Sequence, residues 1–305
     1  MADSGKIGAS IIRLLTRPLA ALPLSFHRRA GRVLGRLAGG LLRYRRDVVI
    51  TNLARSFPQM GYDELQQVCR SFYEHFGTVF CEALWFGGCR GPRRLRGAGI
   101  VRMENQHLLN EMTKRGQSIC VLASHNGNWE LIGGYMSYSP DLELNFSEKE
   151  VCVIFRQLSS PAWNRFFSFN RTAALDDPEH YEGMLESFNV LRYALQHKDE
   201  PKIYNFITDQ YPYTDRGNTE DISFLGQKTC SMNGGAALAH KLGMGVLYMN
   251  MAQTPEGNYT MTYTKICDDA REMDPDEIMR QYYLLLEADI RRQPANYLWT
   301  HKRWK

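Results

Sequence analysis

The sequence predicts an α/β fold in which a largely parallel sheet is flanked by helices and preceded by a basic helical leader. Short apolar runs typical of buried strands alternate with segments of helical periodicity, and this order favours a parallel sheet covered on both faces. Hydrophobic residues make up 44% of the 305 residues, which suffices for a large core and excludes a disordered chain. We expect a leader over residues 1–58 and a main domain over residues 59–305.

The leader concentrates the positive charge of the chain. Residues 1–55 carry 11 lysines and arginines against two acids, although the net charge of the whole chain is only +4. The low overall charge gives no indication of nucleic-acid binding, whereas a basic, leucine-rich segment suits an anionic membrane surface. We therefore predict that residues 1–58 associate with a membrane.

Residues 7–26 are the candidate for a membrane span, but Arg13, Arg17 and two prolines make a span costly. We expect an amphipathic helix whose leucines contact lipid while its arginines reach the headgroups, and a second such helix over residues 28–46. Two alternatives remain: a helical pair packed on the main domain with a solvated basic face, and a transmembrane anchor.

The elements of the main domain follow from the spacing of its apolar residues. Helical periodicity predicts helices over residues 62–85, 101–114, 126–138, 161–171, 181–197, 231–242 and 275–291. Continuous apolar runs predict buried strands over residues 118–124, 151–156 and 202–208, and a hairpin over residues 245–252 and 259–266. Seven cysteines without a C-x-x-C pair indicate reduced thiols in the core, so we predict no metal site and no cofactor.

Residues 124–130, which read S-H-N-G-N-W-E, follow the first buried strand and carry the clearest chemical signal. Ligands of open α/β sheets gather beyond the carboxyl ends of strands, where His125 is placed. Residues five apart on one helix point about 140° away from each other, so His125 and Glu130 can meet only if His125 lies in the loop and Glu130 in the first helical turn, behind Asn128 as N-cap. In that arrangement, Glu130 would orient His125 as a general base.

Spacing alone leaves other interpretations open. His125 could be a structural histidine with Glu130 capping the helix, and a metal site would need a third ligand. A serine esterase is disfavoured because the sequence contains no G-x-S-x-G and because Ser124 points away from His125 along the strand. A catalytically silent membrane-binding protein is a further class.

Several ordered stretches resemble one enzyme family. The H-x-x-x-x-E of residues 125–130 is similar to the signature of the glycerolipid acyltransferase superfamily, and H-N-G-N-W-E resembles that of its lipid A late acyltransferase branch, the lauroyl and myristoyl transferases. The other stretches that resemble this branch are N-L…F-P at residues 52–58, V-I-F-R at 153–156, T-D-Q at 208–210, F-L-G-Q at 224–227 and Y-L-W-T-H-K-R-W-K at 297–305. Two features depart from the pattern: Thr208 replaces a proline, and the link over residues 211–221 is longer.

The resemblance implies a fold like that of glycerol-3-phosphate acyltransferase and catalysis by His125 and Glu130. It implies transfer of an acyl group from acyl carrier protein to a hydroxyl of a lipid A precursor, at the cytoplasmic face of the inner membrane, as a step of glycolipid biosynthesis. Another lipid acceptor, such as a lysophospholipid or a different glycolipid, is the alternative. With either acceptor, the partners implied are acyl carrier protein, an acceptor lipid and the surface of the inner membrane.

The resemblance also implies a set of substrate-binding residues. Arg156 and Asp209 end buried strands; Arg156 would contact an acceptor phosphate or the developing oxyanion, and Asp209 would order Arg156 or the acceptor. Gly127 and Gly226 would let backbone N–H groups approach the oxyanion. The cations expected to bind anionic headgroups are Arg171, Lys228, His301, Lys302 and Arg303. The alternative for each is a turn residue or a solvated charge.

Overall fold

The computed structural model describes residues 4–138, 143–212 and 218–304. Within those residues, seven strands form one sheet in the order β1-β9-β8-β2-β5-β3-β4, and all neighbours pair in parallel except β8 and β9. The strands are β1 (Val101–Glu104), β2 (Ile119–Ala123), β3 (Val151–Phe155), β4 (Met184–Glu186), β5 (Ile203–Ile207), β8 (Gly245–Gln253) and β9 (Tyr259–Cys267). The predicted α/β fold with a largely parallel sheet and a helical leader is confirmed.

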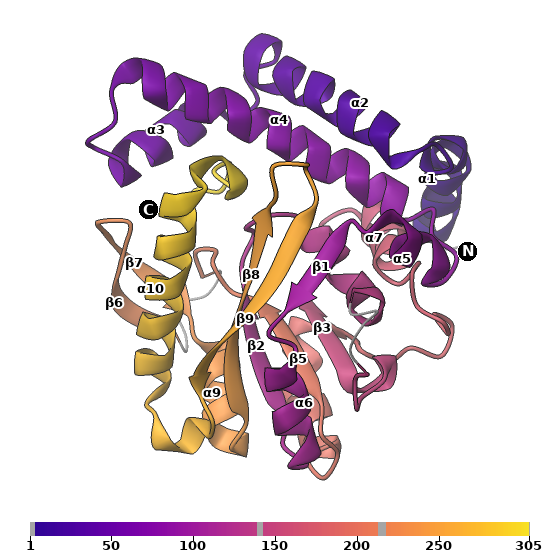
Figure 1. Ribbon diagram of the computed structural model, residues 1–305, viewed down its shortest axis with the longest axis vertical. Helices are drawn as coiled ribbons and strands as arrows, with labels where there is room; N and C mark the ends of the chain where they lie inside the picture. Colours follow the sequence, from indigo (N-terminus) through magenta and orange to yellow (C-terminus); the bar gives the residue numbers. More distant parts are fainter. Residues whose placement is uncertain (1–3, 139–142, 213–217, 305) are drawn as a thin grey trace.

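Helices cover both faces of this sheet (Figure 1). The α-helices are α1 (Ser4–Ala20), α2 (Leu24–Arg36), α3 (Arg46–Ser56), α4 (Tyr62–Phe86), α5 (Arg93–Ala98), α6 (His107–Lys114), α7 (Pro161–Arg171), α8 (Val190–Gln196), α9 (Gly234–Leu242) and α10 (Pro275–Arg292). Short helices of other types are the π-helix η1 (Leu37–Leu41) and the 3-10 helices η2 (Trp129–Ser137), η3 (Glu148–Glu150), η4 (Ser187–Asn189), η5 (Ala270–Glu272) and η6 (Pro294–Asn296). A separate hairpin consists of β6 (Asn218–Phe224) and β7 (Gln227–Met232).

Alternating side chains of the buried strands divide the interior into two cores. On one face, Cys120, Leu122 and Tyr204 pack against α3, α4, α8, α9 and α10. On the other face, Val121 and Ala123 pack against α5, α6 and η2. All seven cysteines are free and five of them are buried, as a set of core thiols requires. The two cores leave the carboxyl ends of β2, β3 and β5 between α9 on one side and η2 on the other.

Four predicted helices contain strands or begin late: the helix predicted over residues 126–138 begins only at Trp129, as the 3-10 helix η2. The segment 101–114 holds β1 before α6, and the segment 181–197 holds β4 and η4 before α8. Residues 231–232 end β7, so α9 begins only at Gly234. The misassigned strands β1 and β4 are short and gain their hydrogen bonds from distant partners, β9 and β3, so their own sequences carry little signal. Of the predicted long link over residues 211–221, residues 213–217 lie outside the described residues.

The leader helices α1 and α2 pack on the main domain. α2 lies along α4, and the two approach so closely that a Cβ on Gly35 would lie 1.9 Å from the carbonyl oxygen of Tyr73 (Figure 1). α1 packs on α7, where the Arg13 guanidinium lies 3.6 Å from the centre of the Phe169 ring. α3 contributes Val49 and Leu53 to the first core, so the boundary at residue 58 stays a prediction.

Among the described helices, no single one has both the length and the apolarity to cross a membrane. The segments Gly5–Ala20 and Leu24–Leu41 meet that criterion only together, across a bend of 113°.

Candidate active site

His125 and Asp209 lie side by side because of the register between two parallel strands. β2 and β5 pair with Ala123 opposite Ile207, so the residues two positions beyond each strand are also neighbours. The Nδ1 atom of His125 lies 2.8 Å from Oδ1 of Asp209, and the backbone N–H of His125 donates to the same oxygen at 3.1 Å. The two donors fix the imidazole relative to the carboxylate.

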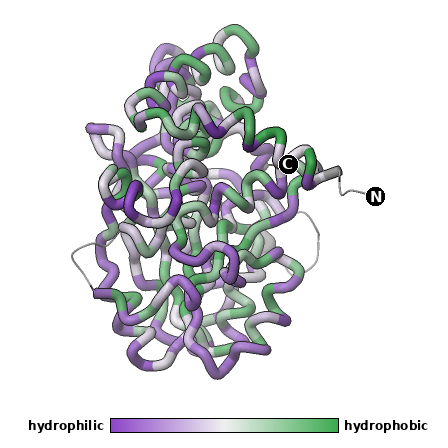
Figure 2. The backbone as a smooth tube through the Cα atoms, turned by 90° about the vertical axis from the view of Figure 1, so that its right-hand side faces the viewer, coloured by the Kyte–Doolittle hydropathy of each residue, from purple (hydrophilic) through white to green (hydrophobic). Residues whose placement is uncertain are grey.

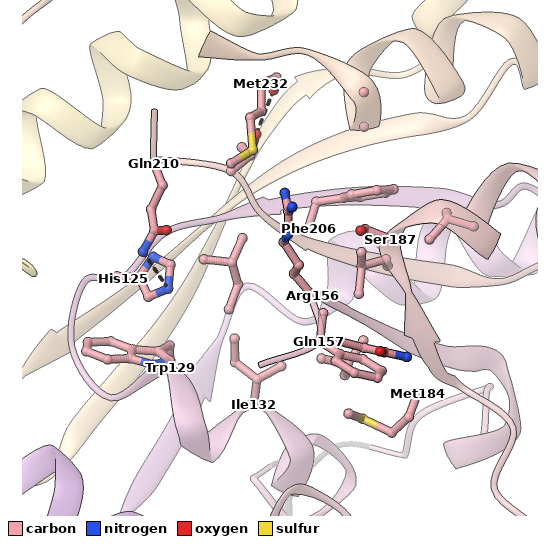
Figure 3. Close-up of a pocket in the computed structure, with 18 of the residues that line it drawn as sticks. His125, Trp129, Ile132, Arg156, Gln157, Met184, Ser187, Phe206, Gln210 and Met232 are labelled. Atoms are coloured by element: carbon pink, nitrogen blue, oxygen red, sulfur yellow. Dashed lines mark hydrogen bonds between the residues drawn. The ribbon is translucent and has the colours of Figure 1, made fainter. Parts of the chain in front are cut away.

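The surroundings of this pair assign its proton positions. Burial raises the pKa of the Asp209 carboxyl, but the charge of His125 and the hydrogen bonds from its ring and backbone outweigh burial, so the pKa is lowered. An ionised Asp209 accepts a hydrogen bond from Nδ1–H and leaves Nε2 of His125 as the acceptor. The Gln210 amide nitrogen lies 3.4 Å from Nε2 (Figure 3). A substrate hydroxyl that displaced the Gln210 amide would meet the basic lone pair of His125.

Glu130 does not orient His125, which corrects the predicted pairing. As predicted, His125 lies in the loop and Glu130 lies in the first turn of a helix, here η2. However, Glu130 forms a bidentate ion pair with Arg171 of α7, in which Nε and Nη2 of Arg171 donate to the two carboxylate oxygens at 2.9 and 2.8 Å. The reason is that α7 docks directly on η2, where a Cβ on Gly133 would lie 1.9 Å from the Arg171 carbonyl oxygen. The side facing His125 is occupied instead by the Trp129 ring, 5.0 Å away between centroids.

The loop after His125 is fixed by packing rather than by a helix cap. Gly127 has φ of +70°, and a Cβ there would lie 2.2 Å from the Met251 carbonyl oxygen. Its N–H donates to the carbonyl oxygen of Asn296 at 2.9 Å, so this N–H already has a partner within the protein. Asn128 does not cap η2; its side-chain amide donates to Glu82 at 2.8 Å.

Further contacts come from distant parts of the chain. The N–H of Leu298 donates to the carbonyl oxygen of His125 at 3.1 Å, and the side chain of Asn126 donates to Asn250 at 2.8 Å. On the α4 side, Nε2 of His75 lies 3.1 Å from the carbonyl oxygen of Gly127. β8, α4 and the C-terminal segment therefore all hold the loop that carries His125.

A cavity of about 980 Å³ opens beside His125 (Figure 3). Its lining is mainly apolar and includes Ile132, Val153, Met184, Val190, Leu191, Phe206 and Leu238. This volume is at the upper end for ligand pockets, about 300 to 1,000 Å³, and suits a long hydrophobic ligand. Glu130, Arg156, Arg171 and Lys241 add charged groups to the lining.

The structure brings only some of the predicted substrate-binding residues to this cavity. Arg156 and Arg171 line it, and Figure 3 shows Arg156 among the lining side chains. Gly226 and Lys228 lie at the turn and in the second strand of the β6–β7 hairpin, outside the lining. The F-L-G-Q stretch, which contains Gly226 and precedes Lys228, therefore lies outside the cavity beside His125.

The C-terminal stretch over residues 297–304 packs largely in the interior of the protein rather than on its surface. Arg303, expected to bind headgroups, is buried; it donates to the Tyr283 hydroxyl at 2.8 Å and contacts the Thr229 hydroxyl. Asn52 of the N-L…F-P stretch donates to the carbonyl oxygens of Trp299 and His301 at 3.0 and 2.9 Å. His301 is half-buried and Lys302 is exposed, whereas Lys305 lies outside the described residues.

A histidine held at Nδ1 by a carboxylate, with Nε2 beside a long apolar cavity, can remove a proton from a hydroxyl bound there. A comparison with curated proteins found no match. A comparison with protein families matched the model described as bacterial lipid A biosynthesis acyltransferase over residues 5–305. Because this match covers nearly the whole chain, the protein belongs to the bacterial lipid A biosynthesis acyltransferase family.

Proposed function

We propose that this acyltransferase moves a fatty acyl group from acyl carrier protein to a hydroxyl of a lipid A precursor, with His125 as general base. The observation that carries the proposal is the His125–Asp209 pair, 2.8 Å apart, at the edge of the 980 Å³ apolar cavity. The family supports the reaction class and the lipid A acceptor. The donor and the roles of individual residues are our inference.

The reaction needs one base that also returns the proton. Nε2 of His125 takes the proton from the acceptor hydroxyl while the hydroxyl oxygen attacks the thioester carbonyl carbon of the donor. Asp209 stabilises the imidazolium that results. When the tetrahedral intermediate collapses, the carbon–sulfur bond breaks and the imidazolium gives its proton to the leaving thiolate, so the products are an ester and a free thiol.

The charged part of the cavity suits the polar end of the reactants. The guanidinium of Arg156 lines the cavity and is suited to an acceptor phosphate or to the developing oxyanion. Arg171 is already paired with Glu130, so its charge is balanced and we assign that pair to holding η2 and α7 together at the cavity wall. The predicted contact of Arg171 with an anionic headgroup stays a prediction.

Replacing His125 tests the chemistry. His125→Ala is expected to lower the rate of acyl transfer by about 10³- to 10⁴-fold, because both proton transfers lose their base. His180→Ala, at an exposed histidine, is the matched control. Wild-type activity in His125→Ala would contradict the mechanism. An unchanged acyl count of lipid A in cells lacking the protein would contradict the acceptor, and equal rates without acyl carrier protein would contradict the donor.

We further propose that the leader holds the enzyme at the cytoplasmic face of the inner membrane. Leu14 and Leu15 of α1 are 71% and 69% exposed, and Leu41 and Leu42 are exposed beyond α2. Exposed arginines lie between these apolar residues, and Figure 2 shows green apolar stretches interrupted by purple polar ones along the helices at the top of the molecule. Leucines that enter the interface and arginines that reach anionic headgroups would act together.

Vesicle binding tests this localisation. Leu14→Glu with Leu15→Glu is expected to weaken flotation with vesicles of anionic phospholipid. Leu284→Glu on α10 is the matched control, because Leu284 is 70% exposed on a helix outside the leader. Equal flotation of all variants would contradict the assignment of α1 to the membrane surface.

A further inference from the structure

A buried network connects the leader with the loop that carries His125. Glu82 of α4 is completely buried, and Nε of Arg28 in α2 donates to its Oε1 at 2.7 Å. The other oxygen of Glu82 accepts from the Asn128 amide and from the Tyr259 hydroxyl, each at 2.8 Å. One carboxylate thus joins a leader residue to the residue three positions after His125.

The charge of Glu82 makes Arg28 more than a packing contact. Burial raises the pKa of the Glu82 carboxyl, and the hydrogen bonds from Arg28, Asn128 and Tyr259 together with the charge of Arg28 offset this rise only in part, so the ionised form depends on those donors. Arg28 also donates to Asn258 in the β8–β9 turn at 2.9 Å. A buried carboxylate that loses its cation either takes up a proton or attracts water, and both disturb its remaining hydrogen bonds.

We propose that Arg28 is a positioning residue for acyl transfer: through Glu82 it fixes Asn128 and so keeps the segment from His125 to Glu130 in its reactive geometry. Asn128 is completely buried and directly precedes η2. A shift of Asn128 moves Trp129, whose ring contacts that of His125. This inference rests on the proposed role of His125.

The consequence concerns the leader as a whole. Arg28 reaches Glu82 only because α2 lies against α4, where Gly31, Gly35 and Gly77 allow the close approach. The packing of α2 on α4 therefore contributes, through Arg28 and Glu82, to holding the loop that carries His125. The leader is predicted to contribute to the chemical step as well as to membrane attachment.

The test compares two neighbouring arginines in the full-length protein. Arg28→Met and Arg29→Met remove the same charge from the same helix, but Arg29 is exposed. With detergent-dispersed acceptor, Arg28→Met is expected to lower kcat by about 10- to 100-fold and leave KM for the acyl donor within about twofold, because misplacement acts on the reacting geometry. Arg29→Met is expected to retain wild-type kcat, and an equal loss in both variants would overturn the proposal.

Neutralising Glu82 gives the rescue. In the Glu82→Gln background the carboxylate is absent, so removing Arg28 leaves no buried charge unpaired, and adding Arg28→Met is expected to lower kcat by less than about threefold. A loss of tenfold or more in that background would contradict the role of the ion pair. This comparison also holds if Arg28→Met alone fails to fold.

Hydrogen exchange gives a readout that does not depend on activity. Amides of residues 124–131 are expected to exchange faster in Arg28→Met than in the wild type, and at the wild-type rate in Arg29→Met. Unchanged exchange in Arg28→Met would overturn the positioning. If instead His125→Ala keeps full activity, the proposed function of His125 fails while the exchange comparison still decides whether Arg28 holds the loop.

Discussion

Substitutions at Asp209 and Glu130 decide which carboxylate serves His125. In Asp209→Asn, the backbone N–H of His125 still needs an acceptor, so the amide oxygen is held where Oδ1 now accepts two bonds, at 2.8 and 3.1 Å. The imidazole therefore keeps its tautomer but loses a charged partner. Exchanging a charge-assisted hydrogen bond for a neutral one costs about 1 to 2 kcal/mol, or a fall in kcat of about 5- to 30-fold.

The two companion variants set the scale. Asp209→Ala removes both acceptor contacts and frees the ring, so we expect a fall in kcat of about 10³- to 10⁴-fold. Glu130→Gln keeps one acceptor for Arg171 and leaves the contacts of His125 intact, so we expect a fall of about tenfold or less. The order of the three effects follows from the distances and not from the position of the residues in the motif.

Single-turnover acyl transfer is the appropriate assay, because it separates the chemical step from binding of the two lipids and from product release. Melting curves of each variant show whether the fold is retained. A larger loss in Glu130→Gln than in Asp209→Asn, with both variants folded, would refute the reasoning and restore Glu130 as the partner of His125.

Two further predictions concern stability. Burial lowers the pKa of His75 to about 4, so as the pH falls the unfolded chain binds a proton at this histidine before the folded chain does. The free energy of unfolding, measured with urea, is therefore expected to fall by about 3 kcal/mol between pH 6.5 and pH 4. This dependence on pH should be smaller in His75→Gln and unchanged in His180→Gln. Gly127→Ala and Gly226→Ala each place a Cβ on a residue with φ of +70° or +74°, which costs about 1 to 2 kcal/mol of stability. Only the Cβ at position 127 would also clash with backbone, at 2.2 Å from the Met251 carbonyl oxygen, so we expect Gly127→Ala to lose about 2 kcal/mol more. Equal losses of unfolding free energy in the two variants would contradict the clash.

The long apolar runs made the central sheet predictable. The segments 118–124, 151–156 and 202–208 became β2, β3 and β5 within a residue or two at each end. Buried parallel strands need apolar residues on both faces, so they are recognised in the sequence as continuous apolar runs. β1 and β4 were missed because four and three residues are too few for a periodic signal, and their pairing with β9 and β3 is a long-range property.

The partner of His125 was missed for a related reason. Both His125 and Asp209 were recognised as residues that follow buried strands, but the register that pairs Ala123 with Ile207 is not written in either strand. Sequence proximity favoured Glu130, five residues away, over Asp209, which is 84 residues away. The useful signal would have been that both polar residues directly follow the last residue of a predicted strand.

The loop residues of H-N-G-N-W-E divide the work in a way that spacing does not reveal. His125 faces the cavity, whereas Asn126 and Asn128 turn inward to Asn250 and Glu82. Glu130 reaches outward to α7. A motif so arranged aims one imidazole and anchors it to β8, α4 and α7 at once. Because three different elements hold this loop, a displacement of any one of them shifts the loop backbone and with it His125. Losses of activity are therefore expected on substitution of residues such as Arg28 that lie far from the cavity.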